Sequence, residues 1–331
     1  MSAVLKDAIV VLDLSDASSL SVRYRDLIAQ AHTIAENVHA IVLREENAAS
    51  VLHELSDAGV SSCVALQVSH SVMTTSALSP ALAQAYALFN VPEAPIFFAT
   101  RFLDRECAAQ LAISLGGCAI SEAVAIRVID GELRATTDAL GGSWRGEVIT
   151  HSTPACICLR SGGLQTSAQP RECVERASIC VEPDSARTLV IERAESAADG
   201  RPSLTDAQVV VVGGRGAGAD WSLVDDLADV LGAAIGSTRD AVDEGWAQRS
   251  TQIGQTGTAI APQLYVSLGV SGAIHHTIGI LASQTIVAVC DDPDAPIFEI
   301  ADFGVVGDLY EVVPQALEHL RAWRESQAAQ Q

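Results

Sequence analysis

The sequence predicts an α/β protein with two domains, each a mainly parallel sheet flanked by helices. Its 331 residues are enough for two domains with buried cores. Short β-branched runs alternate with longer segments of helical periodicity, which is typical of parallel sheets covered by helices. One polar stretch, Glu192–Ser203 (ERAESAADGRPS), has no apolar period and separates two such units. We therefore expect an N-terminal domain over 1–191, a linker over 192–203 and a second domain over 204–331.

Strands of the first domain are expected where the chain has short apolar runs, because strands covered on both faces lack polar alternation. These runs are Ala8–Leu14, Ala40–Leu43, Cys63–Val68 and Ala94–Thr100. The helical patterns between and after them are Ser21–Asn37, Asn47–Gly59, Pro80–Phe89 and Arg105–Gly116. The dipeptide Asp130-Gly131 predicts a hairpin that joins Ala123–Ile129 to Glu132–Thr137. Further strands are expected at Pro154–Leu159 and Leu189–Ile191.

The second domain repeats the alternation on a shorter scale. Its expected strands are Gln208–Val212, Ala233–Ile235 and Leu264–Val270. Its expected helices are Trp221–Leu231 and Val313–Trp323, with a further helix opened by Ser271–His276. This domain is expected to have a Rossmann-like arrangement, in which ligands bind at the carboxyl ends of the strands.

Composition and charge exclude several classes of function. The chain has 20 Lys and Arg residues against 41 Asp and Glu residues, a formal net charge of −21, so binding to nucleic acid or to an anionic membrane surface is not expected. No apolar run approaches the roughly 20 residues that span a bilayer, and the N-terminus has no targeting pattern, so we expect no membrane insertion and a cytoplasmic location. The eight cysteines lack metal-ligand spacing, which predicts reduced thiols and no metal site.

Three turns rich in glycine and in polar side chains follow in the second domain. They are Gly213–Gly218 (GGRGAG), Gln252–Gly257 (QIGQTG) and Ser271–His276 (SGAIHH). Glycines after a strand allow backbone amides to approach a phosphate group. The first turn also satisfies a permissive dinucleotide fingerprint, which leaves open a nicotinamide-dependent dehydrogenase that uses the GGRGAGA turn. The three turns together predict a nucleotide-containing ligand at this edge of the sheet.

These motifs resemble the FAD domain of the electron transfer flavoprotein alpha subunit. The likeness runs in order through GGRG, Thr238–Asp243, QIGQTG, LYVSLGVSGAIHH and DAPIFEIADFGVVGDLYEVVP, and covers about 201–320. Weaker likeness to the first domain of that family occurs in Thr100–Glu122 and in ATTDALGGSWRGEV. The resemblance implies FAD as cofactor and a heterodimer with a beta subunit. It also implies that flavin dehydrogenases donate electrons and that a quinone-reducing acceptor receives them.

The resemblance implies a set of cofactor-binding residues, named here by their place in this sequence. They are Arg215, Thr238, Arg239, Ile253, Gly254, Gln255, Thr256, Ser271, Gly272, Ala273, Ile274, His275, His276, Cys290, Asp308 and Leu309. It places Arg239 over the isoalloxazine ring, the Thr256 hydroxyl near N5 and His276 near the pyrimidine side of the ring. A permanently charged guanidinium and a donating imidazole would stabilise negative charge on the reduced flavin. Asp308 and Leu309 are implied to lie at the adenosine end.

Two positions depart from the family pattern. Cys290 stands where the family usually has asparagine, and a thiol is a weak hydrogen-bonding group. His275 stands where glutamine is common. Neither change falls on the residues expected around the isoalloxazine ring.

The predicted function is electron transfer through flavin semiquinone and hydroquinone states, with no catalytic residue and no substrate turnover of its own. The first domain is expected to serve as scaffold and subunit interface, because it carries no cofactor motif. Two alternatives stay open from the residues alone. One is the nicotinamide-dependent dehydrogenase subunit mentioned above, and the other is an interaction module without flavin.

Overall fold

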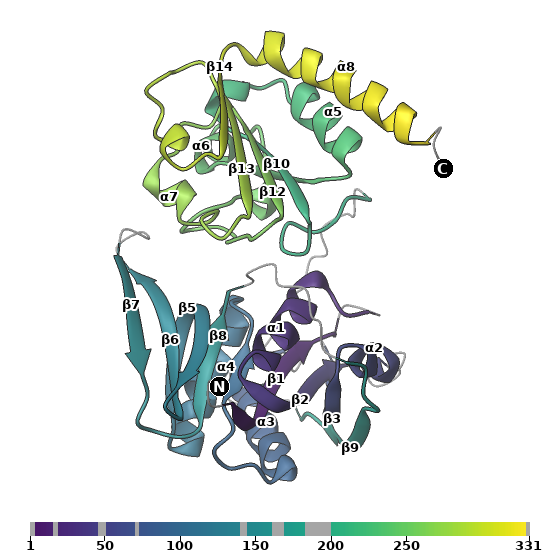
Figure 1. The fold of residues 1–331 in the computed structure, drawn as a ribbon, viewed down its shortest axis with the longest axis vertical. Helices are drawn as coiled ribbons and strands as arrows, with labels where there is room; N and C mark the ends of the chain where they lie inside the picture. Colours follow the sequence, from purple (N-terminus) through teal and green to yellow (C-terminus); the bar gives the residue numbers. More distant parts are fainter. Residues whose placement is uncertain are drawn as a thin grey trace. The chain divides into compact units, whose positions relative to one another are not determined.

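The structure is a computed structural model that describes residues 4–15, 19–45, 51–69, 73–139, 144–160, 169–182 and 200–328. The chain folds as two compact units, Met1–Ser196 and Ala197–Gln331, and each is described by itself (Figure 1). Both contain a mainly parallel sheet flanked by helices, which confirms the predicted fold class. The strand expected at 189–191 and linker residues 192–199 lie outside the described residues.

In the described part of the N-terminal unit, nine strands form one sheet in the order β7-β6-β5-β8-β4-β1-β2-β3-β9. The strands from β5 to β9 in this order pair in parallel, whereas β6 and β7 extend the sheet in antiparallel fashion. Asp130 and Gly131 have φ values of 55° and 82° and form the turn between β5 and β6, which confirms the predicted hairpin. The bounds are β1 (Leu5–Asp13), β2 (Ala35–Arg44), β3 (Val60–Gln67), β4 (Ile96–Phe98), β5 (Cys118–Ile129), β6 (Glu132–Ala139), β7 (Trp144–Ile149), β8 (Ala155–Leu159) and β9 (Val174–Cys180).

Helices cover both faces of this sheet. Helices α1 (Val22–His32) and α2 (Leu52–Asp57) pack on the face that carries Val10 and Leu12 of β1. Helices α3 (Thr75–Phe89) and α4 (Phe102–Leu115) pack on the opposite face, with Ile9 and Val11. Because the central strands are covered on both sides, they contain continuous apolar runs, such as Ala8–Leu12 of β1, as the sequence indicated.

Some boundaries and strands differ from those expected. The helix predicted to reach Asn37 ends at His32, because Ala35 already pairs with Leu5 in the sheet. Helix α3 begins at Thr75 and contains Pro80 rather than starting there. Strands β7 and β9 were not predicted at all. Both lie at the edges of the sheet, where β7 is exposed along its whole length and β9 alternates exposed and half-buried residues, so neither has an apolar run.

The described part of the C-terminal unit contains five parallel strands in the order β11-β10-β12-β13-β14. Numbered within the unit, this is the doubly wound order 2-1-3-4-5, whose topological switch point lies between the first and third strands. Those two strands are β10 and β12 here. The bounds are β10 (Val209–Gly213), β11 (Ala234–Ser237), β12 (Leu264–Leu268), β13 (Thr285–Cys290) and β14 (Phe303–Val306).

The two faces of this sheet are covered differently. Helices α5 (Ser222–Leu231) and α8 (Leu309–Ala328) lie side by side on one face and bury its apolar residues (Figure 1). The other face is covered largely by connecting segments, which contribute Ile253, Ile280 and Ile297 to the core. The short helices α6 (Arg239–Asp243), α7 (Ile274–Thr277), η2 (Arg215–Ala217), η3 (Arg249–Thr251) and η4 (Pro296–Glu299) belong to these connections.

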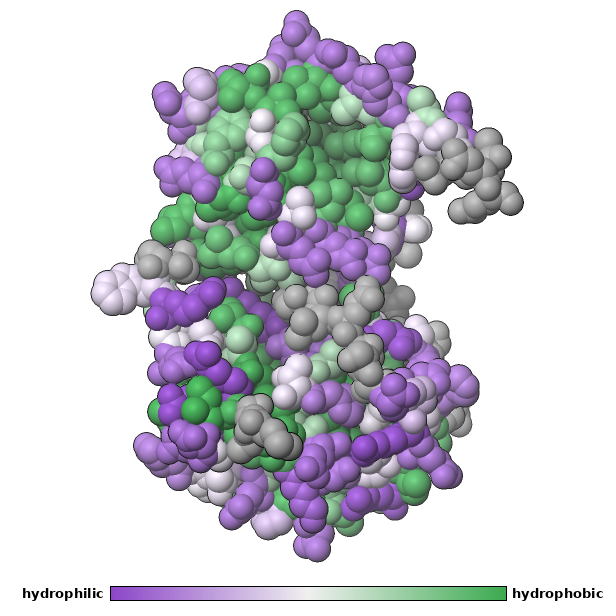
Figure 2. Space-filling view, viewed as in Figure 1, coloured by the Kyte–Doolittle hydropathy of each residue, from purple (hydrophilic) through white to green (hydrophobic). Residues whose placement is uncertain are grey.

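The exposed edge of the small sheet is apolar. Strand β14 forms this edge, and its Phe303 and Val306 are 63% and 55% exposed. Figure 2 shows apolar residues gathered over the part of the C-terminal unit where β13 and β14 lie. Among the described helices, none combines the length and apolar character needed to cross a bilayer. All eight cysteines, each within the described part of the chain, are free.

Candidate functional site

A cavity of about 470 Å³ opens at the carboxyl edge of the small sheet, around the switch point between β10 and β12. Its lining comes from the segments that follow β10, β11, β12 and β13, together with the loop before Thr258. These segments lie together because the carboxyl ends of parallel strands meet at one edge of the sheet. The lining residues are Arg215, Gly216, Thr238, Arg239, Asp240, Gln252, Ile253, Gln255, Thr256, Gly269, Val270, Ser271, Ala273, His275, His276, Cys290, Asp291 and Asp292.

Glycines allow the loops after β10 and β12 to pack backbone against backbone. The Gly216 N–H donates to the Gly269 carbonyl at 2.9 Å, and Gly214 N–H donates to the Leu268 carbonyl at 2.9 Å. A Cβ on Gly214 would lie 2.3 Å from the Gly269 oxygen, and one on Gly269, whose φ is +64°, would lie 2.6 Å from the Ala217 nitrogen. Any larger residue would push these loops apart. These close-packed loops, here called the glycine cradle, bring Gly216 and Gly269 into the cavity lining, where the lack of side chains leaves room for a phosphate group.

Two arginines at the cavity each form one ion pair with a residue that the structure describes, and both pairs lie at the surface. Arg215 Nη1 lies 3.8 Å from Asp240 Oδ2, and Arg239 Nε lies 3.2 Å from Asp243 Oδ2. The arginine side chains are 73% and 65% exposed, so each pair stabilises the fold by at most about 1 kcal/mol. Both guanidinium groups can therefore turn toward an anionic ligand at little energetic cost.

The QIGQTG turn is more deeply embedded than its polar sequence predicted. Gln252 and Ile253 are each only 1% exposed. The Ile253 side chain packs against Gly236 and Gly279, where added Cβ atoms would lie 2.3 Å and 3.1 Å from it. The buried isoleucine anchors the loop and leaves its polar part, including Thr256, at the cavity.

His276 is engaged by the protein on both ring nitrogens. Its Nδ1 lies 3.2 Å from the Ile253 carbonyl oxygen, which can only accept, so Nδ1 carries the proton. Its Nε2 therefore accepts from the Tyr265 hydroxyl at 2.8 Å. Burial lowers the pKa of His276 to about 4, so the ring is neutral at physiological pH. In the structure the ring connects Tyr265 to the Ile253 loop and also lines the cavity, and its place near the pyrimidine side of the flavin stays a prediction.

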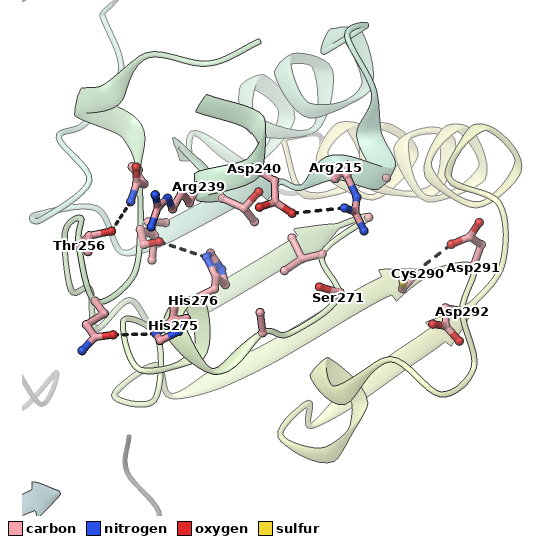
Figure 3. Close-up of a pocket in the computed structure, with 18 residues that line it drawn as sticks. Arg215, Arg239, Asp240, Thr256, Ser271, His275, His276, Cys290, Asp291 and Asp292 are labelled. Carbon is pink, nitrogen blue, oxygen red and sulfur yellow. Dashed lines mark hydrogen bonds and ion pairs between the residues drawn. The ribbon is translucent and has the colours of Figure 1, made fainter. Parts of the chain in front are cut away.

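The far end of the cavity is acidic. In Figure 3, Thr256, His275 and His276 lie toward one end, Cys290, Asp291 and Asp292 lie toward the other, and Ser271 lies between them. The Cys290 thiol is 3.9 Å from Asp291 Oδ1, and the residue is 6% exposed. Carboxylates after a strand of an open α/β sheet suit the hydroxyl groups of a ribose. The cavity thus has a hydroxyl-lined end and a carboxylate-lined end joined by the glycine cradle.

The structure brings together most, but not all, of the residues predicted to bind the cofactor. Gly254, Gly272 and Ile274 belong to the converging loops but do not line the cavity. Leu309 and Asp308 also lie outside its lining. Leu309, the first residue of α8, is 7% exposed and packs in the core, and Asp308 Oδ1 accepts from the Tyr310 N–H at 2.8 Å. Their role at the adenosine end, which the resemblance implied, stays a prediction.

Sequence reasoning missed several lining residues. They are Gly216, Asp240, Gln252, Gly269, Val270, Asp291 and Asp292. The rule that ligands bind at the carboxyl ends of strands could have indicated the two aspartates, since they directly follow β13. Gln252 belongs to the QIGQTG turn that the sequence singled out, but its burial depends on contacts distant in sequence and leaves no local signal.

The fold and the cavity together define a doubly wound protein that binds a nucleotide-containing cofactor. The donor set fits FAD: two guanidinium groups and the cradle suit a pyrophosphate, carboxylates suit ribose, and hydroxyl and amide groups suit the edge of a flavin ring. The volume lies within the range of cofactor pockets, which is about 300–1,000 Å³. Among the described residues, no group of three or more His, Cys, Asp or Glu could hold a metal ion.

Comparisons with known proteins agree with this class. Residues 203–281 match the family described as electron transfer flavoprotein FAD-binding domain, and residues 9–199 match the electron transfer flavoprotein domain. The chain is 36% identical over 324 residues to the electron transfer flavoprotein subunit alpha of Mycobacterium leprae (strain TN), covering 96% of this chain and 99% of the relative. It is 33% identical over 323 residues to that of Bacillus subtilis (strain 168), covering 96% and 98%. A shorter match, 56% identical over 116 residues, links it to that of Mycobacterium tuberculosis (strain ATCC 25618 / H37Rv) and covers 34% and 36%.

The chain belongs to the electron transfer flavoprotein alpha subunit family. Its cofactor is FAD and its C-terminal unit is the FAD-binding domain, which confirms both predictions. The two alternative functions lose their support. In the GGRGAG turn, the 3-10 turn η2 comes first and α5 begins only at Ser222, so the glycines do not lead directly into a helix as a dinucleotide fingerprint requires.

Proposed function

We propose that this chain carries FAD in an extended pose across the cavity of the C-terminal unit, within a two-subunit electron carrier. The flavin ring lies at the Thr256 and Arg239 end, and the adenosine lies at the Asp291 and Asp292 end. The observation that carries this proposal is the cavity itself, which runs between chemically different ends over a glycine cradle. FAD supplies the redox chemistry when bound.

The residues of this chain supply binding and electrostatics. Arg239, with its exposed guanidinium, provides permanent positive charge beside the ring. Thr256 provides a hydroxyl at the ring edge, and Arg215 neutralises the pyrophosphate above the cradle. No covalent step by a protein side chain is needed for this role, which is transfer of electrons rather than turnover of a substrate. The donors are flavin dehydrogenases and the acceptor is a quinone-reducing system.

The extended pose predicts that the chain distinguishes FAD from FMN. FMN lacks the adenosine half, so it forfeits the contacts at the Asp291 and Asp292 end and should bind at least about 100-fold more weakly, a difference of about 2.7 kcal/mol. Titration of the FAD-free full chain with each flavin, followed by flavin fluorescence, measures the two dissociation constants. Equal affinity for FMN and FAD would overturn the extended pose.

We propose that the partner is a beta subunit and that the N-terminal unit is scaffold and subunit interface. The supporting observation is strand β7, an edge strand that is exposed along its whole length. Trp144 on this strand is 68% exposed, and Val148 and Ile149 are 39% and 36% exposed. Edge strands with exposed apolar side chains are commonly covered by another chain.

Trp144→Ser is expected to weaken pairing with the beta subunit more than tenfold, because buried tryptophans at interfaces contribute about 2 kcal/mol or more. Trp323→Ser is the matched control, since Trp323 is similarly exposed at 58% but lies on α8 of the other unit. Co-expression with the beta subunit, followed by analytical ultracentrifugation, measures pairing. If both variants pair as the unchanged chain does, β7 is not part of the interface.

A further inference from the structure

Gln252 holds the Thr256 hydroxyl in a defined direction. Its amide Nε2 lies 3.0 Å from Thr256 Oγ1, and the residue is only 1% exposed although it lines the cavity. The backbone around it is fixed, because Gln252 forms an isolated parallel bridge with Ser237 at the end of β11 and its carbonyl accepts from the Thr258 N–H at 2.8 Å. A buried amide on such a rigid backbone has little freedom to move.

Arg249 determines which way this amide faces. Its Nη1 contacts Gln252 Oε1, and its Nη2 donates to the Thr256 carbonyl at 2.8 Å. A guanidinium has donors only, so the atom that faces it must be the amide oxygen. The NH₂ group of Gln252 therefore faces Thr256, as the hydrogen bonds on both sides of the amide require.

The consequence concerns the proton of the Thr256 hydroxyl. Since Gln252 donates into the oxygen, the hydroxyl proton must point elsewhere. Within the described part of the chain, no other hydrogen bond of Thr256 Oγ1 is seen, and the residue lines the cavity. The hydroxyl is thus left free to donate to a bound ligand.

We propose that Gln252, held by Arg249, is a positioning residue that presents the Thr256 hydroxyl as a hydrogen-bond donor to the flavin ring. This inference rests on the proposed flavin pose. A donor at the ring edge stabilises added negative charge more than it stabilises the neutral ring, so it raises the midpoint potential for the first electron. Gln252 acts on the potential only through the direction of that hydroxyl.

Gln252→Glu reverses the polarity of the contact without changing its shape. A carboxylate only accepts, so Thr256 must turn its proton toward position 252, while Arg249 keeps an acceptor. The experiment compares the unchanged chain with Gln252→Glu, Thr256→Val and the double variant, each as the full chain with FAD bound and paired with its beta subunit. The readout is the midpoint potential for the first electron, measured by spectroelectrochemical titration, with FAD affinity as a second measurement. Gln248→Glu controls for added charge, because Gln248 is exposed and lies four residues upstream.

The expected result is that both single variants lower the potential, that Gln248→Glu leaves it nearly unchanged, and that Gln252→Glu causes little further shift when Thr256 is valine. An equal shift from Gln252→Glu with and without the hydroxyl would overturn the positioning role while leaving the flavin pose intact. No shift in Thr256→Val with FAD bound would instead overturn the pose. If Gln252→Glu fails to bind FAD, Arg249→Met replaces it in the comparison with Thr256→Val. Arg249 is exposed, and its loss allows the Gln252 amide to turn.

Discussion

Replacing Gly269 by alanine is expected to weaken FAD binding at least tenfold and to destabilise the C-terminal unit by about 2–4 kcal/mol. Two physical effects add. Gly269 has a φ of +64°, which disfavours any residue with a Cβ, and that Cβ would lie 2.6 Å from backbone atoms of Gly216 and Ala217. Because the obstacle is backbone, the two loops that form the cradle must separate.

Gly232→Ala separates the two effects. Gly232 also has a φ of +64°, but an added Cβ there meets nothing within 4 Å. In this control, the free energy of unfolding should fall by only about 1 kcal/mol, the cost of placing a Cβ at positive φ, and the FAD affinity should not change. Thermal unfolding and FAD titration of both full-length variants measure the difference. If Gly269→Ala binds FAD as tightly as Gly232→Ala does, the close approach of the loops does not matter for the cofactor.

Arg101→Met is expected to destabilise the N-terminal unit by about 3 kcal/mol, because it leaves two buried carboxylates without their cation. Arg101 follows β4, and its Nη1 donates to Asp13 Oδ2 at 2.8 Å. Its Nη2 and Nε donate to the two oxygens of Asp104 at 2.7 Å and 2.8 Å. The Asp13 and Asp104 side chains are only 6% and 10% exposed. Arg101 is 34% exposed, so solvent screens its charge and reduces the expected loss of stability.

The effect of pH gives this prediction a second test. Burial raises the pKa of Asp13, but the Arg101 charge and hydrogen bonds from Ser15 together hold it below its usual value. Without the guanidinium, burial would dominate and the pKa in the folded state would rise above that in the unfolded state. The loss of stability should then be largest near neutral pH and should shrink as acid protonates the carboxyl groups.

Arg127→Met serves as the control within the same unit. The Arg127 side chain is 56% exposed, and its partner Glu147 keeps a second cation in Arg134, 3.6 Å away. Loss of such an exposed pair should change stability by less than about 1 kcal/mol. Denaturant unfolding of the full-length variants at several pH values measures both changes. Equal losses in Arg101→Met and Arg127→Met, independent of pH, would show that the cluster around Arg101 is not a buried charge network.

The Arg101 cluster lies at the carboxyl ends of two neighbouring strands of the N-terminal unit. Asp13 is the last residue of β1 and Arg101 follows β4, and these two strands are neighbours at the switch point of the large sheet. In open α/β sheets a ligand commonly binds at this place. Here the side chains of the chain itself occupy it and satisfy one another.

The sequence by itself determined the α/β class, the Asp130-Gly131 hairpin and the edge of the small sheet at which the cavity opens. These follow from local physics. A strand covered on both faces must be apolar, a two-residue hairpin needs positive φ, and a loop that packs against another loop or a phosphate needs glycine. Each requirement leaves its mark in a few neighbouring residues, so it can be found without a structure.

Only the tertiary structure decided the roles that depend on distant partners. Ala35 entered β2 because Leu5 pairs with it, and β7 and β9 gain their hydrogen bonds from neighbouring strands rather than from an apolar pattern. The His276 ring is neutral and supports the Ile253 loop, because its two nitrogens form hydrogen bonds with the Tyr265 hydroxyl and the Ile253 carbonyl. The direction of a hydrogen bond and the burial of a polar group are set by all the atoms that surround it in space, and these come from segments far apart in the chain.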